Sequence, residues 1–163
     1  MTKFILPNLT LANVVLVVTA AVLFYVAVTD LKHYRIRNEL ILVLIGLFLL
    51  HTLFSGRWLN AAWSLGLAAF VLVFLVYFYV RHWMGGGDVK ILTVAFLWTG
   101  VECALPFAIL LLVFAFLHTI AARVGWAQSQ QPDDDNRARI AFAPSVAAAL
   151  ICVFMLGCLR PPG

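Results

Sequence analysis

The feature that most constrains this chain is a series of long apolar stretches separated by short polar segments. Apolar stretches begin near positions 9, 38 and 59, and a longer one runs from 91 to 122. A helix that crosses the apolar core of a membrane needs about 20 such residues at roughly 1.5 Å each. Only 11% of the 163 residues are charged and 64% are apolar, too few polar groups to cover the surface of a soluble fold. This pattern excludes a soluble enzyme, a disordered chain and a collagen-like repeat, and it indicates a bilayer protein.

We predict an all-α polytopic membrane protein with six spanning helices, forming a single domain over residues 1–163. The fourth and fifth helices come from the longest apolar region, which we expect a tight turn near Gly100 and Glu102 to divide. The polar segment that contains Asp133, Asp134 and Asp135 is expected to be a solvated loop. The first stretch lacks the basic segment and cleavage site of a secretory signal, so we expect it to be retained. The predicted spans are 9–29, 38–54, 59–80, 89–101, 103–122 and 141–159.

The distribution of Lys and Arg predicts the orientation of these helices. With the N-terminus outside, the inner loops would hold eight of these cations and the outer side three. Cytoplasmic loops carry the excess of Lys and Arg in membrane proteins. We therefore predict that both termini lie outside. The inner cations are Lys32, Arg35, Arg37, Arg81, Lys90, Arg123, Arg137 and Arg139, and the outer ones are Lys3, Arg57 and Arg160.

Two carboxylates are expected on the same face of the membrane. Asp30 follows one crossing and Asp88 follows three, whereas Glu102 follows four and belongs at the opposite face as a turn or interface residue. An ionised carboxylate at the apolar end of a helix is costly and usually has a function or a partner. The structural alternative is that Asp30 is capped or paired with a neighbouring cation and that Asp88 is a helix N-cap.

Three glycines precede the second of these acids. Gly85, Gly86 and Gly87 would allow positive φ angles and would let another chain approach Asp88 closely. An extended peptide substrate would need that clearance. A phosphate-binding loop also uses glycines, but there a Lys follows the last Gly directly and Ser or Thr comes next. We therefore do not assign that function here.

Two carboxylates that converge from separate helices are the minimal machinery of aspartic proteolysis. Like charges at close range do not both ionise easily, so one carboxyl keeps its proton. The ionised carboxylate acts as general base on a water, and the protonated one polarises the scissile carbonyl. This chemistry requires no metal and no cofactor.

Two segments of the sequence resemble the type IV prepilin peptidases. GGGDVK at residues 85–90 matches the GxGDxK motif of that family, whose GxGD is shared with the presenilin-like intramembrane aspartic proteases. DLKHYRIRN at 30–38 is similar to the family's first aspartate, short basic stretch and Ile-Pro-Asn, with Arg37 in the position of the proline. RIAFAP at 139–144 is loosely similar to the motif that opens the family's last helix.

The resemblance implies a membrane-embedded aspartic endopeptidase that removes the basic leader from prepilins or pseudopilins at the cytoplasmic face of the bacterial inner membrane. It implies Asp30 and Asp88 as catalytic residues. Gly85, Gly86, Gly87, Lys90 and Asn38 would shape the loops or the substrate site. The chain contains no CxxC pair. It therefore resembles the short, peptidase-only kind associated with tight-adherence (Flp-type) pili, without methyltransferase activity. The expected partners are the pilin substrate and membrane lipids, not nucleic acid.

Other residue types have simpler interpretations. Cys103, Cys152 and Cys158 are expected to pack as small apolar residues, with a Cys103–Cys158 disulfide at the outer face as the alternative. Trp58, Trp83 and Trp98 lie near predicted helix ends, which is typical of interfacial aromatic belts. His51 and His118 are expected to be packing or interface residues, and Lys90 is a candidate ligand for lipid phosphate.

Two other function classes share some of these features. Paired acids and small residues also suit a proton-coupled transporter or channel, but that class predicts acids near the bilayer midplane and internal repeats. Here both acids lie at one face, and the two halves show no convincing repeat. In a non-catalytic assembly component of a pilus or secretion system, the aspartates would only cap helices.

Overall fold

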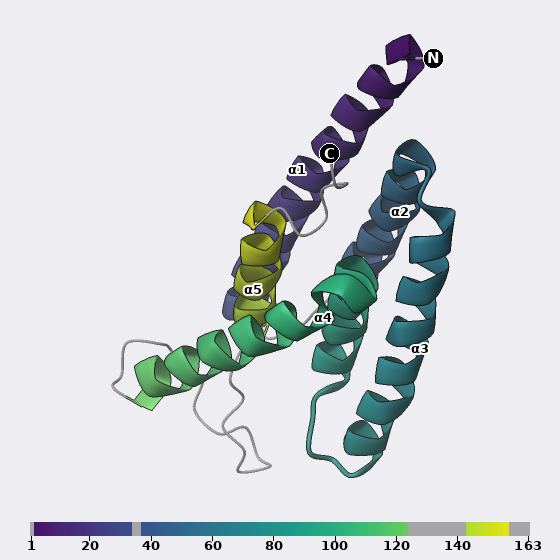
Figure 1. Ribbon diagram of the computed structural model, residues 1–163. Helices are drawn as coiled ribbons and strands as arrows, with labels where there is room; N and C mark the ends of the chain where they lie inside the picture. Colours follow the sequence, from purple (N-terminus) through teal and green to yellow (C-terminus); the bar gives the residue numbers. More distant parts are fainter. Residues whose placement is uncertain (1, 34–36, 124–142, 157–163) are drawn as a thin grey trace.

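The computed structural model describes residues 2–33, 37–123 and 143–156, and these residues form helices and no strand. The all-α prediction is therefore confirmed for this part of the chain. The predicted acidic loop around Asp134 lies outside the described residues. The helices, shown in Figure 1, are α1 (Thr2–His33), α2 (Asn38–Ser55), α3 (Trp58–Val80), α4 (Gly86–Arg123) and α5 (Ala143–Met155).

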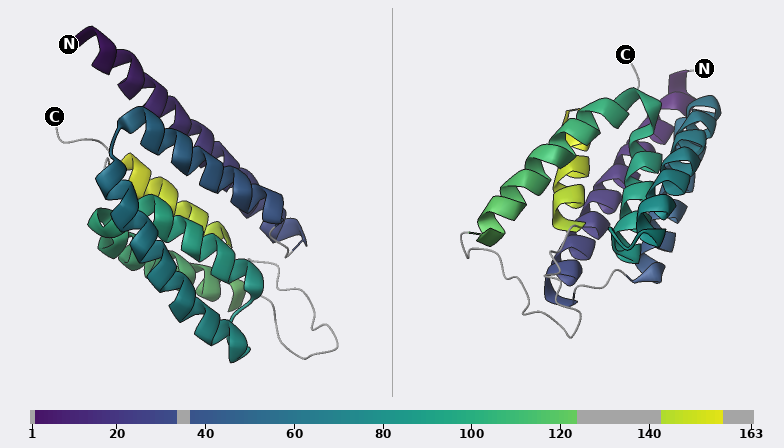
Figure 2. Two further views of the ribbon diagram at one scale, coloured as in Figure 1. Left: turned by 90° about the vertical axis from the view of Figure 1, so that its right-hand side faces the viewer. Right: turned by 90° about the horizontal axis from the view of Figure 1, so that it is seen from below.

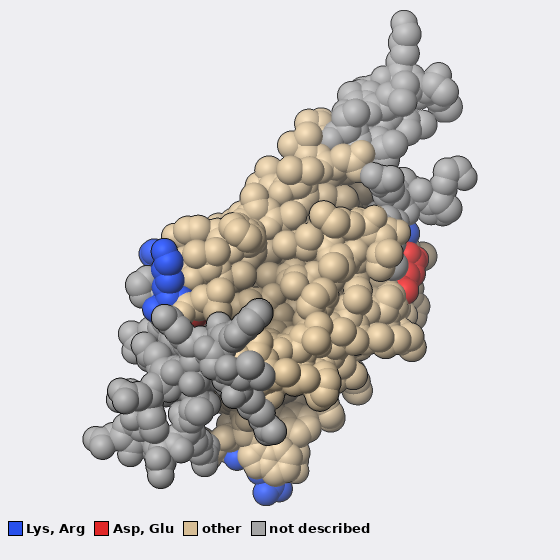
Figure 3. Space-filling model, turned by 90° about the vertical axis from the view of Figure 1, so that its left-hand side faces the viewer, with Lys and Arg blue, Asp and Glu red and all other residues tan. Residues whose placement is uncertain are grey.

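Four of the helices, α1 to α4, are long and apolar enough to cross a membrane, and α5 is apolar but shorter. Large apolar side chains lie on the outer surface of the bundle, as at Phe70 and Val73 of α3, which are 71% and 72% exposed. Figure 3 shows one face on which uncharged residues cover almost all of the described area and charged ones lie at its edges. This surface is suited to lipid rather than water. The number of crossings stays a prediction.

A tight turn joins α2 to α3. Gly56 ends α2 in the left-handed conformation, with φ 67°, and its N–H donates to the carbonyl of Thr52 over 2.9 Å. This is the usual glycine termination of a helix, because a Cβ would be strained at that φ. Only Gly56 and Arg57 separate the two helices, so α3 runs back beside α2.

Helix α4 is divided by a sharp bend at Gly100. The backbone there has φ 60° and ψ −172°, a region that is essentially reserved for glycine. The 38 residues of α4 would extend about 57 Å if straight, against an apolar bilayer core of about 30 Å. The right-hand view of Figure 2 shows that the two limbs of α4 turn back on each other. The predicted break near Gly100 is therefore confirmed.

Neighbouring helices approach closely at this bend. A Cβ on Gly100 would lie 2.6 Å from Oγ of Ser64 in α3. The hydroxyl of Ser64 lies at this contact, and it donates to the carbonyl of Asn60 in its own helix. Glycine is thus needed at position 100 both for the backbone conformation and for the contact between α3 and α4.

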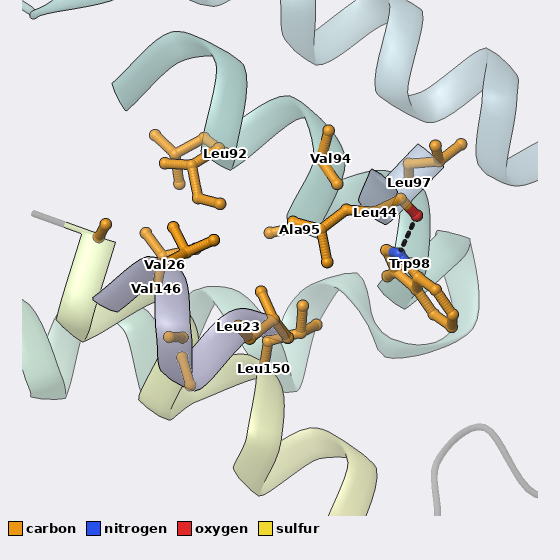
Figure 4. Packing of buried hydrophobic residues seen from close by; sticks show 14 of the residues in the cluster. Leu23, Val26, Leu44, Leu92, Val94, Ala95, Leu97, Trp98, Val146 and Leu150 are labelled. Atoms are coloured by element: carbon orange, nitrogen blue, oxygen red, sulfur yellow. Dashed lines mark hydrogen bonds between the residues drawn. The ribbon is translucent and has the colours of Figure 1, made fainter. Parts of the chain in front are cut away.

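The core lies where the first limb of α4 passes α1, α2 and α5. Leu23 and Val26 of α1 pack with residues of α4 and α5, as Figure 4 shows. Trp98 is only 2% exposed, and its Nε1–H donates to the carbonyl of Leu44 over 3.1 Å. The prediction that Trp98 belongs to an interfacial belt was wrong, because the first limb of α4 runs through the interior of the bundle. Trp58 and Trp83 are 60% and 76% exposed.

The packing brings distant segments of sequence to one end of the bundle. Helix α4 packs on α3 and α5, and α1 packs on α2 and α5. The end of α1 and the starts of α2, α4 and α5 therefore lie together, at the lower end of Figure 1. We call this the Asp30–Asp88 end. The turn at Gly56 and the bend at Gly100 form the opposite end.

Candidate active site

Asp30 lies in the last turn of α1 and is only 5% exposed. Its Oδ2 accepts a hydrogen bond of 3.1 Å from the backbone N–H of Ala143, the first residue of α5. The first N–H groups of a helix have no partner within the helix and carry the positive end of its dipole. The start of α5 thus supplies a favourable site for a carboxylate in an otherwise apolar interior.

Asp88 is the third residue of α4 and is half-buried. Its carboxylate accepts a hydrogen bond from the backbone of Gly85, and the carbonyl of Gly85 accepts from the N–H groups of Asp88 and Val89 over 3.1 and 3.2 Å. An acid that reaches back from the third helical position is one half of a capping box. The residue in the N-cap position is therefore Gly85, whereas the structural alternative placed Asp88 there.

The structure brings Asp30 and Asp88 near enough for the charge of Asp30 to act on Asp88. Among the described residues, the ion pairs are Arg37 with Glu39 and Arg57 with Glu102, so neither acid of the pair is matched by a Lys or Arg. Each carboxylate is held instead by a backbone N–H at a helix start. Such an arrangement fixes two like-charged groups without neutralising either of them.

The glycines before Asp88 act differently from the prediction. None of Gly85, Gly86 and Gly87 has a positive φ, so the expected left-handed backbone was wrong. The space beside two of these glycines is occupied by other groups of the chain. A Cβ on Gly85 would lie 3.1 Å from Oδ2 of Asp88, and a Cβ on Gly86 would lie 3.3 Å from Cε2 of Tyr79. These positions are small because a side chain and a ring occupy the space beside them.

Lys90 and Asn38 join the two segments that carry the acids. Nζ of Lys90 donates to Oδ1 of Asn38 over 2.8 Å, which ties the start of α4 to the start of α2. From the sequence we predicted lipid phosphate as a ligand of Lys90, whereas in the structure its ammonium group donates to the side-chain amide oxygen of Asn38. This bond is exposed, and it links the starts of the two helices.

His118, Ser145 and Ala143 were not predicted as site residues. Nδ1 of His118 lies 3.3 Å from Oγ of Ser145, and the charge of His118 acts on Asp30. Ala143 contributes only its backbone, so no residue-type signal in the sequence could have identified it. His118 gives no local signal either, because it reaches Asp30 from the second limb of α4.

The described residues contain no group of three or more His, Cys, Asp and Glu that could hold a metal ion. Cys103 is disulfide-bonded and Cys152 is free. The prediction that Cys103 is only a small packing residue was therefore wrong. Cys158 lies outside the described residues.

A sequence model of the type IV leader peptidase family matches residues 17–159. This range is most of the chain and contains Asp30, Asp88, the three glycines and the start of α5. The chain belongs to the type IV leader peptidase family. Neither the curated proteins nor the solved structures that were searched include a match to it.

Membership of the leader peptidase family indicates a peptidase, and it implies a protein substrate of the prepilin type. The departure at Arg37 is explained by its backbone. Arg37 has φ −71° and ψ 134°, close to the φ of about −65° that proline enforces. Arg37 thus has a proline-like backbone conformation without being proline, and its side chain pairs with Glu39. Of the RIAFAP segment, only Ala143 and Pro144 lie within the described residues.

Proposed function

We propose that this leader peptidase is an aspartic endopeptidase in which Asp30 and Asp88 form the catalytic pair. The observation that carries the proposal is the juxtaposition of these two acids, each held by a helix-start N–H and neither paired with a cation among the described residues. Structural carboxylates in apolar surroundings are usually matched by an opposite charge. Two unmatched acids, close enough for the charge of one to act on the other, are poised to share one proton.

The reaction follows from the sharing of that proton. The ionised carboxylate removes a proton from a water, whose oxygen bonds to the carbonyl carbon of the scissile peptide. The protonated carboxyl donates to the carbonyl oxygen, which gives a tetrahedral gem-diol. Collapse of this intermediate breaks the C–N bond, and the leaving nitrogen takes up a proton from the pair. The two carboxyl groups share this proton and titrate together, so the pair works as a unit.

The substrate proposed for this site is the junction between the basic leader and the apolar helix of a prepilin or pseudopilin. Such a junction lies at the membrane boundary, where the proposed topology would also put Asp30, near the end of α1, and Asp88, near the start of α4. Asp88 is only half-buried, so a substrate chain could approach it from the exposed side. Leader removal without methylation and a role in tight-adherence pili belong to the same proposal.

We further propose six crossings, with the Asp30–Asp88 end at the cytoplasmic face of the inner membrane. Two observations support this orientation besides the cation distribution. The bend at Gly100 lets α4 cross twice. The disulfide-bonded Cys103 follows that bend at the opposite end, and disulfides persist in oxidising compartments outside the cytoplasm. Alkaline phosphatase fused after Arg57 should be active, and the same fusion after Arg81 should be inactive.

The activity is tested with the purified full chain in lipid vesicles and a prepilin from the same organism. We expect a mobility shift on gels and, by N-terminal sequencing, a new unmethylated N-terminus directly after the basic leader. An uncut prepilin, with wild-type chain shown to be folded and inserted, would overturn the proposal.

A further inference from the structure

A cavity of about 390 Å³ lies at the end of the bundle opposite to Asp30 and Asp88. It is an open cavity lined by residues from the last turns of α2, the first turns of α3 and the bend of α4. Along α2 it is about 20 Å from Asn38 at 1.5 Å per residue, so it is not part of the proposed active site. Its volume falls within the range of small-molecule sites, about 300–1,000 Å³. The aromatic wall is made by Phe48, Trp63 and Trp98.

The rim of the cavity carries one cation and one anion side by side. Nη2 of Arg57 lies 3.3 Å from Oε2 of Glu102, and Nδ2 of Asn60 donates to Oε1 of Glu102 over 3.1 Å. The Glu102 side chain is 64% exposed and that of Arg57 is 28% exposed. A guanidinium has five N–H donors and a carboxylate about four acceptor sites, so both groups can bind a ligand while they remain paired.

A histidine is among the polar residues that line the cavity. His51 lines it and contacts the ring of Trp98, with centroids 5.6 Å apart. Within the described residues His51 has no hydrogen-bond partner, and no enclosed side-chain nitrogen or oxygen there is left unpaired. The imidazole nitrogens are therefore open to the cavity. The neighbouring hydroxyls differ, because Thr52 and Ser64 donate to carbonyls of their own helices.

We infer that this cavity binds one phospholipid with a zwitterionic amine headgroup, such as phosphatidylethanolamine. The phosphate would lie on Arg57 and the ammonium on Glu102, while an acyl chain enters between the aromatic side chains and His51 donates to an ester carbonyl. The ion pair is neutral as a whole, which disfavours an anionic lipid. A choline headgroup has no N–H to donate to Glu102, so the same site distinguishes the two zwitterions.

The location of the cavity favours a lipid over a soluble ligand. Trp63 is 66% exposed and borders the cavity on the apolar outer surface of α3. Charged side chains appear at the ends of the bundle, where the headgroups of a membrane would lie. A phospholipid in the bilayer therefore reaches both the aromatic wall and the ion pair. The proposal does not depend on the peptidase mechanism.

Native mass spectrometry of the purified full chain tests the inference. The chain is titrated in detergent with phosphatidylethanolamine, phosphatidylcholine and phosphatidylglycerol of identical acyl chains. We expect one phosphatidylethanolamine per chain, bound about tenfold more tightly than the other two, as a hydrogen-bonded charge contributes. Equal retention of all three lipids would overturn the proposal and would mean unspecific lipid contact only.

Two pairs of variants sharpen this test. Ala61→Phe fills the cavity and should abolish retention, whereas Ala62→Phe, at a neighbouring exposed position outside the lining, should retain the lipid. Glu102→Gln keeps the size of the side chain and should remove the preference for ethanolamine over choline. Glu39→Gln, an exposed acid at the other end, should keep it. Retention by Ala61→Phe, or an unchanged preference in Glu102→Gln, would contradict the assignment.

Discussion

The two ends of the bundle both contain carboxylates and glycines, yet they use them in opposite ways. At the Gly100 end, Glu102 is held by Arg57 and Asn60, and Gly100 has a backbone conformation that other residues rarely adopt. At the other end, the charge of Asp30 acts on Asp88, the described hydrogen bonds to both acids come from backbone N–H groups, and the glycines beside Asp88 have ordinary φ angles. An ion-paired carboxylate beside a glycine with an unusual backbone conformation, as at Gly100, indicates a structural turn. Two carboxylates without a cationic partner beside glycines, as at Asp30 and Asp88, indicate a candidate catalytic site.

The largest effect is expected when either acid of the pair is replaced. Asp30→Asn and Asp88→Asn preserve shape, and Asn can still accept the backbone hydrogen bonds. Each variant removes the base or the proton donor, so we expect prepilin cleavage to fall about 10²–10⁴-fold. Cleavage is measured as mobility shift against time, with insertion checked by membrane fractionation.

The matched control for that prediction is Glu39→Gln, an exposed carboxylate on the same end that is paired with Arg37. We expect it to cleave at the wild-type rate. If Asp30→Asn or Asp88→Asn were as active as this control, the two acids would have only a structural role.

A smaller loss is expected when space is filled beside Asp88. A Cβ at position 85 would be 3.1 Å from Oδ2 of Asp88, so Gly85→Val must displace the carboxylate. Misplacement of a reacting group by about 1 Å costs roughly a hundredfold in rate, and we expect that loss for Gly85→Val. The variant Gly85→Ala should lose less, since only Cβ must be accommodated.

The control for the glycine series is Gly66→Ala in the middle of α3, where an added Cβ meets nothing within 4 Å. It should cleave normally. Full activity of Gly85→Val would show that Asp88 tolerates a neighbour and that its position is not critical.

The bond between Lys90 and Asn38 predicts a still smaller effect. Lys90→Met and Asn38→Leu each break it, and we expect each to lower cleavage about tenfold, as for a hydrogen bond to a charged group. Because both changes remove the same bond, the double variant should be no slower than the worse single one. Independent losses that multiply in the double variant would show that the two residues act separately.

The smallest effect on chemistry is expected at the opposite end. Gly100→Ala places a Cβ 2.6 Å from Oγ of Ser64 on a backbone that disfavours it. We expect the free energy of unfolding to fall by about 1–3 kcal/mol, measured by denaturant titration in detergent. The control is Gly46→Ala, whose Cβ would meet nothing within 4 Å. Its free energy of unfolding should not fall. Equal stability of both variants would contradict the structural role given to the bend.

Much of this architecture could be predicted from hydropathy, because a lipid-facing helix must be apolar along its whole length. The break near Gly100 was predictable for a related reason, since 38 residues of helix exceed one crossing. The helices are longer than the predicted spans. Helix α1 runs from Thr2 to His33 and contains the predicted span 9–29, because a helix can continue past the apolar segment into polar sequence.

The partners of the acids could not be predicted from the sequence. The crossing number places Asp30 and Asp88 on one face, but it does not say which helix start lies against each carboxylate. Ala143 reaches Asp30 through its N–H, which every residue but proline possesses. The burial of Trp98 was missed for a similar reason, since the sequence shows its nearness to a helix end but not which limb passes through the core.

The central claim is that Asp30 and Asp88 act as one unit, and the double variant Asp30→Asn/Asp88→Asn tests it most directly. Its cleavage rate is compared with those of both single variants, in vesicles, with the same prepilin and equal amounts of inserted protein. When two groups share one catalytic task, removal of the second costs little after the first is lost. We predict that the double variant is as slow as either single variant. A double variant slower by the product of the two single losses would contradict the account.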